Sequence, residues 1–90
     1  MTARRWIPNP DVASVDDGDR VVIILLTDLG ASGPRILSGS AAEIWRWLDH
    51  TESEIVELIA RRHGISTNEA GDALTAFIQQ LAGERLVVQR

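Results

Sequence analysis

The chain has 90 residues, with 13 acidic residues against nine arginines and no lysine, and its formal net charge is -4. This length allows one domain, over residues 1–90, with a small hydrophobic core. The acidic charge disfavours binding to the phosphate backbone of nucleic acids. The absence of cysteine excludes disulfides, thiolate metal sites and a cysteine nucleophile.

The sequence carries no membrane or export signal. Its longest apolar run, residues 21–26, is far too short to span a bilayer. Residues 1–8 lack the apolar region of a signal peptide. We therefore expect a soluble, cytoplasmic and unprocessed protein with no membrane partner.

Extended segments are predicted in the first half of the chain. Two prolines hold residues 6–11 extended, and a short strand then starts at Val12 and ends in a tight turn at residues 16–19. Residues 20–27 follow with an unbroken Val, Ile and Leu run. Such a run is typical of a central strand that is covered on both faces, or of one whose outer face receives something else.

A third strand is predicted over residues 34–37, after a flexible connection. Pro34 cannot donate a ladder hydrogen bond, so this strand is expected to begin at a sheet edge. An unpaired edge presents main-chain groups to which another chain can hydrogen bond. The third strand is therefore a candidate docking site.

Three helices are predicted from a repeated capping signature. In each case a Ser or Thr is followed three residues later by Glu, an arrangement in which each side chain satisfies an otherwise unpaired amide. The helices are expected over residues 41 to about 50, 52–63 and 67–82. The second is expected to end at Gly64, in the left-handed position after a helix, and the third to end at Gly83. The capping pairs are Ser40/Glu43, Thr51/Glu54 and Ser66/Glu69.

The third helix carries more apolar residues than one core-facing stripe requires. Part of its surface is therefore expected to remain outside the core, beside the open strand edge. A short extended tail follows at residues 86–88. The predicted fold class is α+β, a winged helix-turn-helix with a three-stranded antiparallel sheet followed by three helices. The apolar set of the third helix is Ala70, Ala73, Leu74, Phe77, Ile78 and Leu81.

The sequence resembles the PqqD-like family from about residue 12 to residue 88. Members of this family recognise precursor peptides of ribosomally made, enzymatically modified natural products. The resemblance implies that the leader peptide binds as an added strand on the third strand, in a groove walled by the third helix. It is carried, in spacing as much as in identity, by residues 17–22, 37–45, 48–49, 54–56, 72–81 and 86–87.

The predicted peptide-binding residues come from the third strand and the third helix. Strand addition has a physical basis apart from the family, because edge hydrogen bonds give affinity and pockets for alternate side chains give selectivity. Two alanines of the helix are small enough to let a peptide backbone approach. Leu74 and Phe77 either floor a pocket or belong to the core. The full set is Pro34, Arg35, Ile36, Leu37, Ala70, Ala73, Leu74 and Phe77.

The resemblance favours a particular partner. It implies a stand-alone leader-recognition protein of a lasso-peptide pathway, which delivers the precursor peptide to a leader peptidase and a cyclase. A PqqD-type chaperone that serves a radical enzyme is the alternative. One departure from the lasso type is the third strand, where many members carry aromatic residues and this chain has Arg35, Ile36 and Leu37.

Catalytic and metal sites are not expected. His50 and His63 lie 13 residues apart with no third ligand at a suitable spacing. Ser40 is explained as a helix cap, and no nucleophile elbow surrounds it. The acidic residues of the predicted turn at 16–19 lack the distal Glu of a calcium loop. We predict no enzyme activity, no catalytic residue, no cofactor and no metal.

Two other functional classes stay open. A winged-helix DNA-binding regulator would read the major groove with the third helix, which has no Lys or Arg between Thr67 and Gly83. A small structural subunit of a larger enzyme is the other alternative. We favour the peptide-binding adaptor and expect no nucleic-acid partner.

Overall fold

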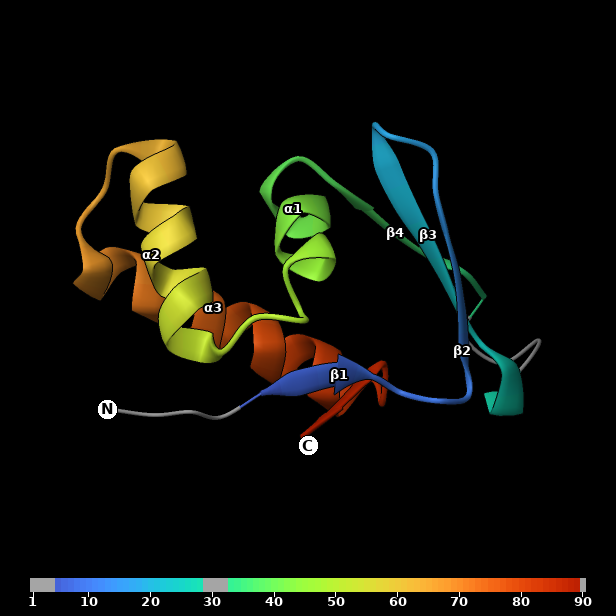
Figure 1. Cartoon of the computed structure of the whole chain (residues 1–90). Helices are drawn as coiled ribbons and strands as arrows, with labels where there is room; N and C mark the ends of the chain where they lie inside the picture. The colour runs from blue at the N-terminus through green and yellow to red at the C-terminus, as the bar shows by residue number, and fades with distance from the viewer. Residues whose placement is uncertain (1–4, 29–32, 90) are drawn as a thin grey trace.

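The computed structural model describes residues 5–28 and 33–89. Three strands form an antiparallel sheet in the order β2-β3-β4, and two form a separate antiparallel pair, β1-β5. The helices all lie on one side of the three-stranded sheet (Figure 1). The elements are β1 (Trp6–Pro8), β2 (Val12–Asp16), β3 (Arg20–Leu25), the 3-10 helix η1 (Leu26–Asp28), β4 (Arg35–Ser38), α1 (Ser40–Arg46), α2 (Glu52–His63), α3 (Thr67–Gly83) and β5 (Val87–Gln89).

This architecture confirms the predicted α+β class with a three-stranded antiparallel sheet and three helices. It also confirms that the Val, Ile and Leu run forms the central strand. Val21 and Ile23 on the inner face of β3 are fully buried, whereas Val22 and Ile24 on the outer face are only half-buried. The strand ends two residues earlier than predicted, because the chain turns into η1 at Leu26.

The core fills the space between the inner face of the sheet and the helices. Helix α1 packs directly against β3 and β4, and α2 packs against α3. In the described part of the chain, no helix combines the length and the apolar composition needed to cross a bilayer. The buried apolar side chains are Val21, Ile23, Leu37, Ala42, Ile44, Trp45, Leu48, Ile55, Ile59, Ala70, Leu74, Ile78, Leu81, Leu86 and Val87.

Two of the three predicted capping residues are confirmed. Thr51 forms a full capping box with Glu54 at the start of α2, and the Ser66 hydroxyl accepts from the Glu69 amide at the start of α3. The prediction for Ser40 is wrong. Gly39 occupies the cap position of α1 with φ 60°, and Ser40 is already helical and makes no capping hydrogen bond.

Helix ends follow the predictions only in part. Helix α2 ends at Gly64 in the left-handed conformation, as predicted. Helix α1 ends at Arg46, short of the predicted residue 50, because the chain turns before the extended cap at Thr51. Helix α3 continues through Gly83, and the left-handed residue there is Arg85 with φ 60°.

The two ends of the described chain pair with each other. Ile7 lies opposite Val88 in the β1-β5 ladder, and the Trp6 indole donates to Glu52 Oε2 over 2.7 Å. Sequence analysis predicted both segments as extended but did not predict that they pair. This ladder fixes the chain that follows α3, including Leu86, against the rest of the domain.

Candidate functional site

The three-stranded sheet has two edge strands, β2 and β4, and each pairs only with β3 among the described residues. The edge considered for peptide binding is β4, because its inner face lies beside the end of α3. Antiparallel strands alternate the direction of their main-chain groups along the strand. Hydrogen bonds from the Asp17 amide to the Arg20 carbonyl and from the Leu26 amide to the Asp11 carbonyl join β3 to the β2 side. The main-chain groups of even-numbered residues in β3 therefore face β2, and those of odd-numbered residues face β4.

The same alternation identifies which groups of β4 are available. Arg35 and Leu37 lie opposite the odd-numbered residues Ile23 and Val21, so their main-chain groups face β3. The N–H and C=O groups of Ile36 consequently point to the open edge. An extended peptide that pairs with β4 would hydrogen bond to Ile36.

The side chains of β4 divide between the two faces of the sheet. Leu37 is 3 % exposed and lies in the core. Arg35 points to this same inner face, because side chains two residues apart share a face. Ile36 points to the outer face and is 54 % exposed. The predicted groove therefore needs correction, because Ile36 lies on the face of the sheet opposite the helices.

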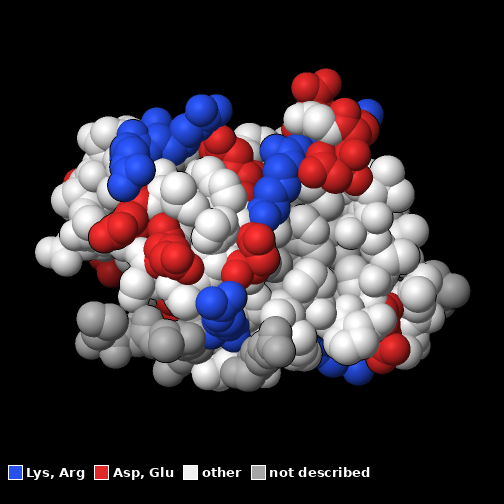
Figure 2. Space-filling model, in the orientation of Figure 1, with Lys and Arg blue, Asp and Glu red and all other residues white. Residues whose placement is uncertain are grey.

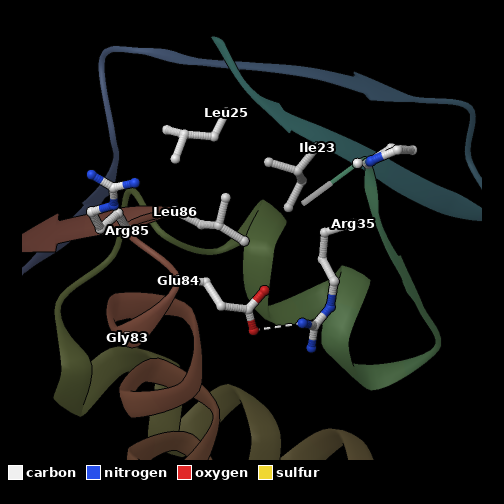
Figure 3. A pocket seen from close by; sticks show the side chains of 9 residues that line it. Ile23, Leu25, Arg35, Gly83, Glu84, Arg85 and Leu86 are labelled. Atoms are coloured by element: carbon white, nitrogen blue, oxygen red, sulfur yellow. Dashed lines mark hydrogen bonds and ion pairs between the residues drawn. The ribbon is translucent and has the colours of Figure 1, made fainter. Parts of the chain in front are cut away.

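A cleft of about 390 Å³ opens beside the start of β4 (Figure 3). It lies between the inner face of the sheet and the C-terminal end of α3. Across it, Arg35 Nη1 donates to Glu84 Oε2 over 2.5 Å, and both side chains are partly exposed. The described lining residues are Ile23, Leu25, Gly33, Pro34, Arg35, Gly83, Glu84, Arg85 and Leu86.

The predicted residues of α3 divide into two groups. Ala70 and Leu74 are 0 % and 3 % exposed, so they are core residues, and neither lines the cleft beside β4. Ala73 is exposed and Phe77 is half-buried. Ala73, Phe77 and Glu84 follow one another at intervals of four and seven residues, so they share one helix face. Glu84 contacts Arg35 of β4. Ala73 and Phe77 therefore lie on the side of α3 that faces the open edge.

The cleft itself was not predicted. Only Pro34 and Arg35 of the predicted set line it, and its other described residues are Gly33, two residues of β3 and the chain around the end of α3. The pairing of Arg35 with Glu84 joins residues 49 positions apart, for which a single sequence offers no signal. Leu86 could have been suspected, because an apolar tail after the last helix has to pack somewhere.

Charged residues elsewhere on the surface form structural pairs. Figure 2 shows acidic groups gathered beside arginine at the top of the molecule, next to a broad uncharged area. Arg46 binds Asp16 through two hydrogen bonds of 2.7 and 2.8 Å at the β2-β3 turn. These bonds, with the Gly18 amide, lower the pKa of Asp16 to about 2. The Arg20 and Asp19 amides likewise lower the pKa of Asp17.

The two histidines also pair with carboxylates. His63 Nε2 lies 3.4 Å from Glu43 Oε1, and Arg62 Nε lies 2.8 Å from Glu43 Oε2, which links the end of α2 to α1. His50 lies near Glu54, in the turn between α1 and α2. Among residues 5–28 and 33–89, no three metal-ligating side chains come together.

Comparison with known proteins gives two matches. The family described as coenzyme PQQ synthesis protein D (PqqD) matches residues 24–87. A solved structure described as "TbiB1 in Complex with the TbiA(beta) Leader Peptide" is similar with a TM-score of 0.80. It is 23% identical, and the similarity covers 90% of this chain and 93% of that chain. Comparison with curated proteins gives no match.

Proposed function

Because this chain belongs to the PqqD family, we propose that it binds the leader segment of a ribosomally synthesised precursor peptide that is later modified by enzymes. The single observation that carries this proposal is the open edge of β4. It offers the main-chain groups of Ile36 to an incoming strand, and the cleft lies directly beside it. The similar TbiB1 structure is described as a complex with a leader peptide.

In the proposed complex the leader forms a fourth strand next to β4. The main chain of the leader forms hydrogen bonds with that of Ile36. Every second side chain of the leader points inward, towards the cleft and the exposed side of α3. Pro34, Arg35, Ala73 and Phe77 remain proposed contacts from the original set. The Leu37 side chain is no longer a proposed contact, because it is buried in the core.

The protein is proposed to recognise the peptide and not to alter it. It would present the leader to maturation enzymes, with the leader peptidase and cyclase of a lasso-peptide pathway favoured. The alternative is a PqqD-type role with a radical enzyme. Both roles place it in the cytoplasm, where precursor peptides are made, and neither requires a cofactor or metal.

Amide shift mapping tests the proposal. The neighbouring genes are searched for a short precursor peptide, and the ¹⁵N-labelled protein is titrated with the leader of that candidate and with a scrambled leader as control. We expect saturable shifts at Ile36, Ser38 and the cleft residues with the true leader only. Shifts confined to Arg61, Arg62 and the C-terminal strand, with β4 silent, would contradict strand addition.

A matched pair of variants tests the α3 side of the site. Ala73→Arg places a long side chain on the helix face that turns towards β4, while Gln79→Arg places the same charge on another side of α3. Both positions are exposed, and Arg is a good helix former, so both variants are expected to fold. Leader binding should fail in Ala73→Arg and persist in Gln79→Arg.

A further inference from the structure

Charged side chains line the cleft beside β4. Its described lining contains two arginines, Arg35 and Arg85, and one carboxylate, Glu84. Figure 3 shows the two arginines on opposite sides of the cleft, with Glu84 between them. The contact of Arg35 with Glu84 uses one guanidinium nitrogen, Nη1. The remaining N–H donors of Arg35 are complementary to an acidic group.

Arg35 is positioned to bind a second carboxylate. Its guanidinium contacts Glu84 through Nη1, and a guanidinium has five N–H donors in a fixed plane. A carboxylate from a ligand can therefore join Arg35 without displacing Glu84. The bond to Glu84 also holds the long side chain across the cleft, which lowers the entropy that a ligand would have to remove.

Arg85 is held in the cleft wall by the turn that ends α3. Its φ of 60° lies in the left-handed region, which a residue with a side chain rarely adopts. The turn that ends α3 fixes this conformation, because the Arg85 amide donates to the Ala82 carbonyl over 3.0 Å and the Leu86 amide donates to the Leu81 carbonyl over 2.9 Å. Asn9 supports the turn, because its Nδ2 donates to the Arg85 carbonyl over 2.8 Å.

The rest of the cleft is apolar. Ile23 is fully buried, Leu86 is 5 % exposed, and Leu25 is partly buried at its rim. A ligand that suits this lining places an apolar side chain over these residues and an acidic group against Arg35. The cleft is therefore built for a peptide that carries both kinds of side chain on one face.

We propose that this cleft selects leader peptides with an acidic residue opposite Arg35 and an apolar residue two positions away, an inference that rests on the proposed function. The spacing follows from the strand register. The peptide residue opposite Arg35 points inward, and so does the residue two positions along the peptide towards Gly33, because side chains two residues apart share a face. The acidic side chain meets the guanidinium, and the apolar one reaches the part of the cleft wall that Leu25 and Leu86 form.

Selection from a library of random linear peptides displayed on phage tests this inference. The immobilised proteins are the natural chain, Arg35→Met and Arg46→Met. Arg46 is the matched control, because its side chain is 33% exposed, as is that of Arg35, and it pairs with a carboxylate away from the cleft. Partly exposed ion pairs contribute little to stability, so both variants are expected to fold.

The natural chain and Arg46→Met are expected to enrich peptides with Asp or Glu two positions from an aliphatic residue. Arg35→Met should keep the aliphatic preference and lose the acidic one. For one enriched peptide, we expect Arg35→Met to weaken binding about tenfold. The same peptide with Asn in place of Asp, or Gln in place of Glu, should bind the natural chain and Arg35→Met equally.

The outcomes separate this inference from the proposed function. Enrichment of aliphatic peptides without an acidic preference, or an equal acidic preference in Arg35→Met, overturns the inference and leaves peptide binding intact. No enrichment of any peptide by the natural chain overturns the proposed function, and the inference with it. A preference for Lys or Arg opposite position 35 would show that Glu84 is the selecting group and would also overturn the inference.

Discussion

Replacing Ile36 by proline tests the open edge of β4 at a single donor. The Ile36 N–H points away from β3, so its loss removes no hydrogen bond of the sheet. Proline is tolerated in edge strands where the missing donor faces outward, and Arg35 already has the extended conformation that a following proline requires. The Ile36 side chain is 54 % exposed, so its removal costs little core packing.

The expected loss of leader affinity follows from one main-chain hydrogen bond. Such a bond contributes about 0.5–1.5 kcal/mol, which corresponds to roughly 2- to 13-fold in the dissociation constant. Strands pair about 4.8 Å apart, so the proline ring also obstructs the incoming backbone and should bring the loss to the upper end of this range. Ile36→Ala is the matched control, because it shortens the same side chain and keeps the N–H.

Titration calorimetry with the leader peptide measures both variants, and urea unfolding checks that each is folded. Leu37→Pro should behave differently, because its N–H faces β3 and its loss breaks the ladder inside the domain. Equal affinities for folded Ile36→Pro and Ile36→Ala would refute the strand-addition geometry. A stable Leu37→Pro with an unstable Ile36→Pro would refute the assignment of the outward-facing groups.

Three further predictions concern stability and are measured by urea unfolding. Thr51→Ala should lower the free energy of unfolding by about 0.5–2 kcal/mol through loss of the capping box, whereas Ser40→Ala should change it little. Arg85→Gly should raise it by about 0.5–1 kcal/mol, because glycine adopts the left-handed conformation without strain. The lowered pKa of Asp16 stabilises the fold above pH 3.8, and this contribution is lost as the pH falls towards 2. In Asp16→Asn the free energy of unfolding should therefore fall less steeply over that range, and an unchanged slope would contradict the assigned cause.

Local signals explain why much of the fold could be predicted. The capping box at Thr51 and the left-handed Gly64 depend on residues within one turn, so the sequence pattern contains all the interacting groups. Ser40 has the same pattern and fails, because Gly39 adopts a positive φ and takes the cap position one residue earlier. The β1-β5 ladder joins residues from opposite ends of the chain, and two short extended segments carry no signal that identifies each other as partners.

The site was predicted less completely than the fold. The apolar width of α3 showed that some of its surface lies outside the core, but not which part. The centre of the buried stripe falls along Ala70, Leu74 and Leu81, which leaves Ala73 and Phe77 at its margin. That choice depends on how the helix is rotated against the sheet, a tertiary property that the spacing of apolar residues does not fix.

Strand addition at β4 would divide the leader between two environments. Residues on the inner side meet Arg35, the apolar floor of the cleft and the exposed margin of α3. Residues on the outer side lie beside Ile36 and continue a face that includes Val15, which is 68 % exposed, and which no described element covers. Ile36 is an exposed aliphatic side chain without charge, so it discriminates little between the side chains beside it. In this geometry, selectivity for the leader would come mainly from every second residue, on the side where the cleft lies.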